Sequence, residues 1–240
     1  MRSRFRPLVA AVSFAAAAAQ AQEVRSGPVF SLSGFGTVGA VGTDTRDAQY
    51  VIPGQTHGAG KSWSGDVDSR LGLQLGARFN DMFSATLQLL SRQDGEGSFK
   101  PAIEWAFAKL QATPGLGLRV GRMGIPLFAV SDFRDVGYAN TWLRPPIDVY
   151  GQVPVSHFDG ADVTWQTTVA GKLVTLQALA GQSSSRVEGT KVEIDSLVGV
   201  NGTIELVEGL HLRLGHVRGK LTVRSALVNQ LAAGLRQTPF

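Results

Sequence analysis

Residues 69–81, SRLGLQLGARFND, alternate apolar and polar side chains. The apolar set includes Leu71 and Leu73, and the intervening set includes Arg70 and Arg78. A period of two residues predicts a β-strand with two different faces. In a soluble β-sandwich the leucines would form the core, whereas in a membrane barrel they would face lipid and the arginines would face a water-filled lumen.

The same alternation recurs along the chain and predicts an all-β, antiparallel protein of about nine strands. In the segment 102–110 we expect Ile103, Trp105 and Phe107 on the apolar face and Glu104 on the polar face. The predicted strands are residues 29–41, 69–81, 83–92, 102–110, 118–122, 160–167, 173–181, 192–204 and 210–217.

The connections between these strands alternate between long and short. Transmembrane barrels are built with short turns at one end and longer loops at the other, whereas a sandwich has no reason to keep this alternation. The long connections are 42–66, 93–101, 123–157 and 182–191, and the short ones are 80–82, 112–117, 168–172 and 205–209.

Charged residues occupy the polar faces of the predicted strands. Burying such charges in a protein core costs several kcal/mol each unless they are paired, but they are tolerated if the interior holds water. The opposite faces are nearly free of charge, which favours lipid on the outside, with Phe79, Trp105, Phe107 and Trp165 in an aromatic girdle. The expected inward charges are Arg70, Arg78, Arg92, Glu104, Asp162 and Arg213.

The N-terminus predicts a secretory signal peptide over residues 1–21. Three arginines precede an apolar stretch, and AQA at 19–21 fits the small-residue cleavage rule. The formal charge of the whole chain is +4, and Arg2, Arg4 and Arg6 supply three of these charges, so that the chain without its leader carries about +1. The basic balance therefore gives no argument for binding nucleic acid.

The composition favours strands over helices. The chain has no cysteine, 29 glycines and 10 prolines. Beyond residue 21 no stretch approaches the ~18 consecutive apolar residues of a membrane helix, so that a membrane-spanning chain would have to cross with strands. Together with the signal peptide, this suits a larger periplasmic or outer-membrane protein of a Gram-negative bacterium.

Three segments resemble the general porins of Gram-negative outer membranes, the trimeric class with 16-stranded barrels. These are LRVGRMGIPLF (118–128), VGYANTWLRPP (136–146) and FDGADVTW (158–165). The resemblance implies that a long loop, about residues 123–156, folds into the barrel and narrows the pore. It also implies passive diffusion of small hydrophilic solutes or ions, no enzymatic activity and no cofactor. The implied partners are outer-membrane lipid, lipopolysaccharide, the barrel-assembly machinery and two further copies in a homotrimer.

The chain departs from this family in length and at its C-terminus. It ends in phenylalanine, but LAAGLRQTPF (231–240) lacks the alternation of a closing strand, and Pro239 would remove a hydrogen-bond donor. Nine is also an odd strand number, whereas single-chain bacterial barrels are even. Residues 22–240 are therefore interpreted as an incomplete, truncated barrel. An eight-stranded barrel with one extra strand is the alternative.

Charges on the barrel wall and on the long loop are the candidate determinants of selectivity, because opposed acids and bases across a constriction orient polar solutes. Ordinary solvated charges or structural ion pairs would give the same sequence. Arg119 and Arg122 are an odd number of positions apart, so both point inward only if a bulge intervenes. The candidate pore-lining residues are Arg70, Arg92, Glu104, Arg119, Arg122, Asp132, Asp135, Arg144 and Asp148.

No catalytic or metal-binding set is visible. The four histidines lack metal-ligand spacing, and no serine lies in a nucleophile elbow. In WLRPPIDVY (142–150), Arg144 precedes two prolines that stiffen the loop, where it would either clamp an anionic solute or anchor the loop. Two alternatives to a porin stay open, namely a soluble secreted β-sandwich or adhesin that binds a partner, and an outer-membrane barrel enzyme such as a lipase.

Overall fold

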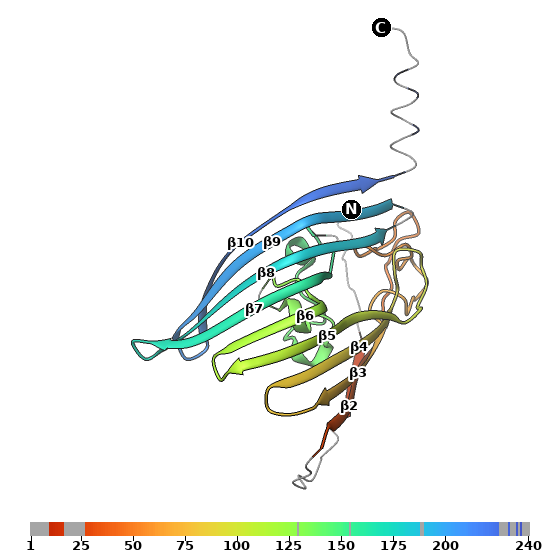
Figure 1. The fold of residues 1–240 in the computed structure, drawn as a ribbon. Helices are drawn as coiled ribbons and strands as arrows, with labels where there is room; N and C mark the ends of the chain where they lie inside the picture. Colours follow the sequence, from red (N-terminus) through yellow and green to blue (C-terminus); the bar gives the residue numbers. More distant parts are fainter. Residues whose placement is uncertain are drawn as a thin grey trace.

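The computed structural model describes residues 10–16, 27–128, 130–153, 155–187, 190–225 and, singly, 230, 234 and 236. These residues form one antiparallel sheet in which each strand pairs with its neighbours in sequence (Figure 1). The strands are β1 (Ala10–Ala16), β2 (Val29–Ala40), β3 (Arg70–Arg78), β4 (Phe83–Arg92), β5 (Ala102–Thr113), β6 (Leu116–Gly124), β7 (His157–Val169), β8 (Lys172–Val187), β9 (Thr190–Val207) and β10 (Leu210–Arg224).

The predicted all-β, antiparallel architecture is confirmed, and β2 to β10 correspond one by one to the nine predicted strands. Several are longer than the alternation indicated, β8 and β10 most of all. The described residues form a single sheet and not two sheets packed face to face, so that a sandwich is not what this part of the chain builds. The sheet is also not closed into a barrel, because β1 and β10 are its edges and do not pair.

Strand β1 falls within the segment predicted to be a signal peptide. It pairs with β2 along seven positions, from Ala10 opposite Ala40 to Ala16 opposite Gly34. The rest of the predicted leader lies outside the described residues, as does most of the C-terminal segment 231–240. The signal peptide stays a prediction, and its removal would leave β2 as the edge of the sheet.

The sheet has one apolar and one mixed face. In β3 the exposed fraction of Leu71 is 66% and that of Leu73 is 49%, while Arg70 and Gln74 lie on the other face. The apolar residues of β2, β7 and β10 are similarly exposed, as Leu32, Val163 and Leu214 illustrate. Water-soluble proteins rarely expose a contiguous apolar surface of this extent.

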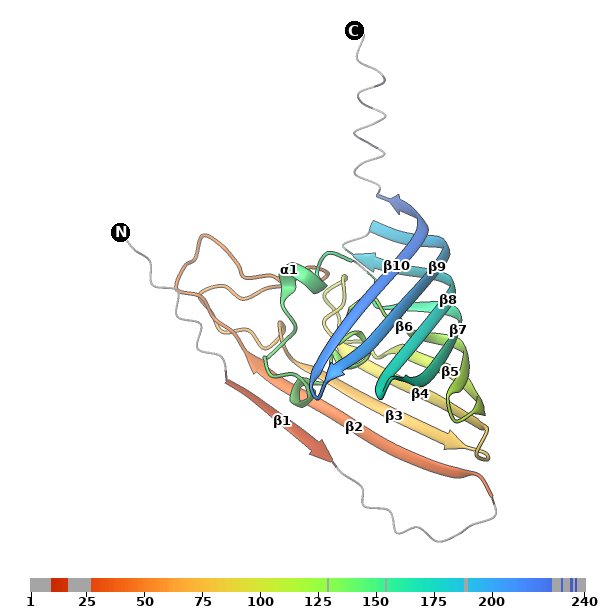
Figure 2. The same ribbon diagram turned by 90° about the vertical axis from the view of Figure 1, so that its left-hand side faces the viewer.

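The connection between β6 and β7, residues 125–156, crosses the concave face of the sheet (Figure 2). It contains the 3-10 turns η1 (Ser131–Phe133) and η2 (Gly137–Ala139) and the short helix α1 (Ile147–Tyr150). We call this segment the long loop. In the described part of the chain no helix is long and apolar enough to cross a membrane.

A small apolar core fixes both ends of the long loop to the sheet. Ile125 and Val155 of the loop are buried against Met123 and Phe158, the inward residues of β6 and β7, and against Leu179 of β8. Met123 and Phe158 have no exposed surface. Each fully buried side chain of this kind contributes about 2 kcal/mol, so that the loop is held to the concave face by its two ends.

Strand β5 does not follow the predicted alternation throughout. A bulge in β5 pairs Trp105 with Gln88 and Ile103 with Leu89. Glu104, which lies between them in sequence, therefore has no residue opposite it on β4. Because a bulge shifts the side-chain alternation by one residue, Glu104 and Trp105 both face the concave side. Phe107 follows Trp105 and packs against the small core, so these two aromatics do not belong to the outer face where the sequence placed them.

Candidate functional site

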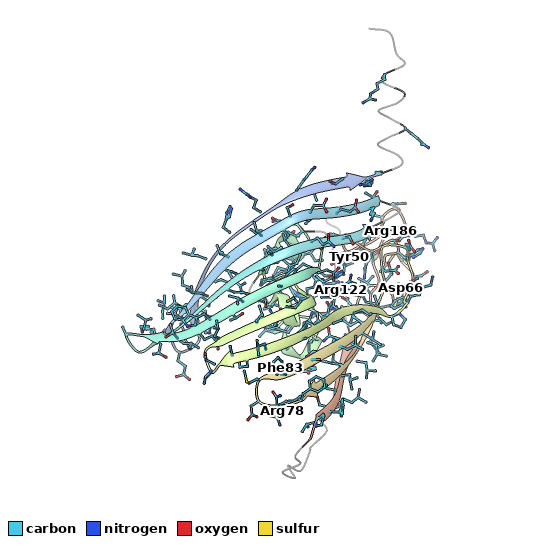
Figure 3. The ribbon with its side chains drawn as sticks, viewed as in Figure 1. Tyr50, Asp66, Arg78, Phe83, Arg122 and Arg186 are labelled. Carbon is cyan, nitrogen blue, oxygen red and sulfur yellow. The ribbon has the colours of Figure 1, made fainter. Side chains whose placement is uncertain are left out.

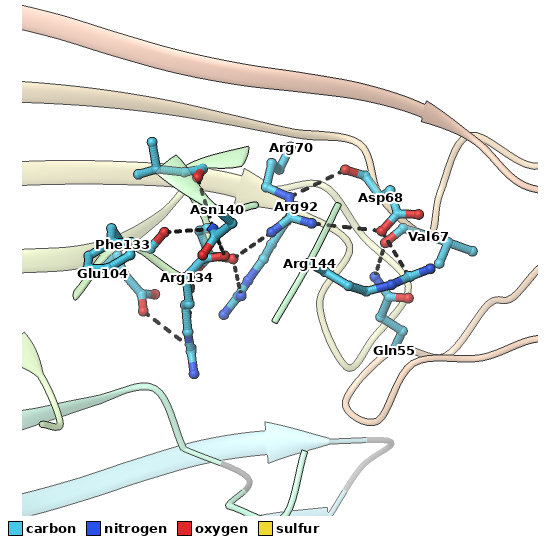
Figure 4. Close-up of polar contacts among 12 residues, drawn as sticks. Gln55, Val67, Asp68, Arg70, Arg92, Glu104, Phe133, Arg134, Asn140 and Arg144 are labelled. Carbon is cyan, nitrogen blue, oxygen red and sulfur yellow. Dashed lines mark hydrogen bonds and ion pairs between the residues drawn. The ribbon is translucent and has the colours of Figure 1, made fainter. Parts of the chain in front are cut away.

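Asp135 of the long loop joins the loop to the sheet. Its Oδ1 accepts hydrogen bonds from Arg92 Nη1 of β4 at 2.7 Å and from Arg70 Nη1 of β3 at 3.2 Å. Its Oδ2 accepts one from Arg134 Nε at 3.4 Å. Figure 4 shows the three arginines converging here from two strands and the loop. We call these three arginines with Asp135 the loop-side cluster.

The register of the sheet explains why the cluster needs a carboxylate. Arg70 and Arg92 are directly opposite each other on β3 and β4. Like charges in that position destabilise a sheet unless an anion lies between them. Burial alone would raise the pKa of Asp135, but Arg92, Arg134 and Arg70 together hold this pKa below its ordinary value. Asp135 is therefore ionised at neutral pH and binds both strands.

The bulge in β5 supplies a second acid to the same surface. Glu104 Oε1 lies 3.7 Å from Nη2 of Arg134, and the Glu104 side chain is largely buried. Without the bulge the ordinary alternation would not have put Glu104 and Trp105 on one face. The loop is thus connected to three consecutive strands, β3, β4 and β5, through charged contacts.

Arg144 is a structural anchor of the long loop. Its Nη1 donates to Oδ1 of Asp68, just before β3, at 2.9 Å, and its guanidinium lies 5.1 Å from the ring centroid of Tyr50. The Asp68 side chain has no exposed surface. Burial raises its pKa above the ordinary value, although Arg144 and Arg70 oppose this effect. These contacts favour the anchoring interpretation of WLRPPIDVY over an anion clamp.

Replacing Arg144 by glutamine should destabilise the protein more at high pH than at low pH. An acid whose pKa is raised in the folded state binds its proton more tightly there, so stability falls as pH rises above the ordinary pKa of Asp. Removing Arg144 raises the pKa of Asp68 further, so that the loss of stability continues over a wider pH range above the ordinary pKa of Asp. Urea unfolding in detergent across that range measures this loss.

The matched control is Arg186→Gln, because the ion pair of Arg186 with Glu96 is 61% and 55% exposed. Exposed pairs contribute about 0–1 kcal/mol, and we expect no pH-dependent change in this variant. Equal pH profiles for Arg144→Gln and the wild-type chain would show that Arg144 does not neutralise Asp68.

A second polar network lies farther along the sheet. Arg119 of β6 forms a two-bonded ion pair with Asp162 of β7 and lies over the ring of Phe107 at 5.4 Å. Gln177 of β8 donates to Asp162 at 2.6 Å and accepts from Asn201 of β9 at 3.0 Å. Every side chain of this network lies on the concave face.

The long loop reaches this second region as well. Arg213 Nη2 of β10 donates to the carbonyl oxygen of Pro126 at 2.6 Å. Asp132 lies close to β6, since a Cβ on Gly124 would lie 3.1 Å from its Oδ1. Burial raises the pKa of Asp132 in spite of the opposing effects of Arg119 and Arg213. The loop is therefore connected to β3 on one side of the sheet and to β10 on the other.

Arg122 does not belong to the concave set. It is opposite Asp159 of β7, and the two side chains form a two-bonded pair with both distances at 2.8 Å. The neighbouring pairs Arg119 with Asp162 and Met123 with Phe158 lie on the concave face, so that Arg122 lies on the convex face. No bulge intervenes between the two arginines of β6, and the regular alternation separates them.

The remaining candidate, Asp148, is exposed on α1, and its carboxylate has no ion-pair partner within the described residues. Sequence reasoning missed Asp68 and Arg134, which complete the network. The charge of Arg134 is visible in the sequence, but one of its two acidic partners, Glu104, is 30 residues away and is brought near only by the fold of the loop. Asp68 lies in a connection, where strand alternation gives no signal.

A cavity of about 650 Å³ opens beside the loop-side cluster. Three acids line it, namely Asp94, Glu104 and Asp135. The loop-side cluster contributes to this wall, and Ile147 and Tyr150 of α1 line it as well. The cations that line it are Arg70, Arg92, Lys100, Arg134, Arg144 and Arg186.

The comparisons with known proteins give no family. No protein-family model matches the chain, and neither the curated proteins nor the solved structures gave a match. Among the described residues no group of three or more His, Cys, Asp or Glu side chains is placed to hold a metal ion.

Proposed function

We propose that this chain forms the wall of a water-filled outer-membrane channel of the general porin type, through which small hydrophilic solutes or ions diffuse passively. In this proposal strands β2 to β10 span the membrane, the convex face contacts lipid, and the concave face lines the pore. The long loop narrows the pore beside the loop-side cluster.

The observation that carries the proposal is the contrast between the two faces of one sheet. Leu71 and Leu73 are exposed on the convex face, while their neighbours Arg70 and Gln74 lie on the concave face. Lipid stabilises an exposed apolar face and penalises charge by ~2–4 kcal/mol at mid-bilayer. One charged pair of the convex face, Arg122 with Asp159, lies near the long-loop ends of β6 and β7, where headgroups and water would solvate it.

The directions of the two edge strands determine how the sheet could close into a barrel. Consecutive strands are antiparallel, so β2 and β10 run in the same direction. Once the predicted leader is removed, antiparallel closure between these edges requires an odd number of further strands. Closure therefore requires strands besides β2 to β10, which is consistent with the proposal of a larger barrel, 16-stranded and trimeric.

The proposed setting follows from the same physical picture. The channel would lie in the outer membrane, in contact with lipid and lipopolysaccharide, after insertion by the barrel-assembly machinery. No catalytic step is part of this proposal.

Reconstitution in a planar lipid bilayer tests the proposal. The full chain should require detergent for solubility and should give discrete conductance steps when added to the bilayer. Asp135→Ala, which frees the long loop, should increase the step size. A chain that is folded and monodisperse in plain buffer and produces no steps would contradict the proposal.

A further inference from the structure

We propose that a second group of basic residues on the concave face, Arg78, Lys109 and Arg119 with the hydroxyl of Ser84 between them, binds small oxyanions such as carboxylates or phosphates. We call these four residues the turn-side row. The inference deepens the proposed function and rests on it for the part that concerns transport. The expected binding of anions rests on an excess of cations over acids in the turn-side row, and this excess does not depend on transport.

The strand register places the four residues in one line across the sheet. Arg78 of β3 is opposite Ser84 of β4, Ser84 is opposite Lys109 of β5, and Lys109 is opposite Arg119 of β6. Directly opposite residues in neighbouring antiparallel strands lie on the same face, with Cβ atoms about 5 Å apart. Since Arg119 is on the concave face, the whole row is on that face.

The charges of the row are only partly neutralised. Asp162 is occupied by Arg119 and by Gln177. Within the described part of the chain, neither Arg78 nor Lys109 has a hydrogen-bond or ion-pair partner. Lys109 and Arg119 are directly opposite each other, where like charges are destabilising. An anion between them relieves this repulsion, as Asp135 relieves the repulsion of Arg70 and Arg92 in the loop-side cluster.

The row is separate from the loop-side cluster. Ser84 and Arg92 are at opposite ends of β4, about 27 Å apart at ~3.4 Å per residue. In Figure 3, Arg78 lies at the end of the sheet away from Asp66 and Arg186. The long loop supplies the acid of the loop-side cluster, whereas among the described residues no acid of the loop pairs with Arg78 or Lys109.

The donor set suits an oxyanion. Lys109 offers an ammonium with three donors, Arg78 offers a planar guanidinium, and Ser84 offers a hydroxyl between them. Charge-assisted hydrogen bonds of this kind are the usual means by which proteins hold carboxylates and phosphates. Because Arg78 is exposed and Lys109 is partly exposed, the binding is weak and reversible, which is what a solute in transit requires.

Calorimetric titration of inorganic pyrophosphate into the full chain in detergent, at low salt, tests the binding. We expect Lys109→Gln and Arg78→Gln each to weaken binding about threefold to tenfold, the effect of one charge near a dianion in a watery environment. Arg122→Gln removes an arginine from the convex face and should leave the affinity unchanged. Succinate in a second titration shows whether carboxylates bind as phosphates do.

Equal affinities in the wild-type chain, Lys109→Gln and Arg78→Gln would overturn the inference, as would an equal loss in Arg122→Gln. The zero-current potential of reconstituted channels in a KCl gradient then separates the two proposals. A preference for chloride that falls about twofold in Lys109→Gln supports both proposals. Pyrophosphate binding without any conductance would support anion binding at the turn-side row and would contradict the proposed channel function.

Discussion

Replacing Asp135 by alanine is expected to cost about 3 kcal/mol of the free energy of unfolding and to release the long loop. The substitution leaves Arg70, Arg92 and Arg134 without their shared carboxylate. Removing one partner of a largely buried charge network typically costs ~3–5 kcal/mol, and the partial exposure of Arg92 puts the expected loss at the lower end. Urea unfolding in detergent, followed by circular dichroism, measures this loss.

Asp148→Ala is the matched control, because Asp148 lies on the same loop but is exposed. Its unfolding should be unchanged within about 0.5 kcal/mol. Limited proteolysis supplies an independent readout, since the freed loop of Asp135→Ala should be cleaved faster than that of Asp148→Ala. Indistinguishable behaviour of the two variants would mean that Asp135 does not hold the loop.

Replacing Gly160 by valine should be the most damaging change within the sheet itself. Gly121, Gly160 and Gly181 are paired in register across β6, β7 and β8. A Cβ on Gly160 would lie 2.1 Å from the carbonyl oxygen of Ala180 and 2.7 Å from the Cα of Gly181. Backbone atoms of a hydrogen-bonded strand cannot move aside as a flexible side chain can, so we expect a loss of about 3 kcal/mol.

Gly117→Ala in β6 is the control for this steric effect. The nearest atom to a Cβ at Gly117 is the side-chain Oε1 of Gln111 at 3.4 Å, an ordinary contact. Heat-modifiability on a gel and unfolding in urea should show a folded protein for Gly117→Ala and a strongly destabilised one for Gly160→Val. Normal stability of Gly160→Val would contradict the close approach of β7 and β8.

The sheet was predictable because alternation is a local signal. A strand such as β4 (Phe83–Arg92) follows from the period of two and the turn before it, and no distant contact is needed. The failures occurred where the period breaks. The bulge in β5 moves Trp105 and Phe107 from the expected outer face to the concave face. It depends on the register with β4, which a short stretch of sequence does not predict.

The sequence predicted which residues belong to the candidate site better than it predicted which of them contact one another. Arg70, Arg92 and Asp135 were selected as opposed charges, and the structure brings these three together. Their arrangement depends on how the long loop folds across the sheet, which sequence spacing does not encode. Arg122 shows the reverse case, because Arg119 and Arg122 could both point inward only through a bulge in β6, and no bulge is present between them.

The central claim is that the convex face of the sheet contacts lipid while the concave face contacts water. The chain contains no cysteine, so single cysteines can be introduced at Leu73 and Gln74, neighbours on opposite faces of β3. In protein reconstituted into lipid vesicles, a water-soluble maleimide should modify Gln74→Cys and spare Leu73→Cys, because the thiolate that reacts forms only in water. Rapid modification of Leu73→Cys in the vesicles would contradict the claim.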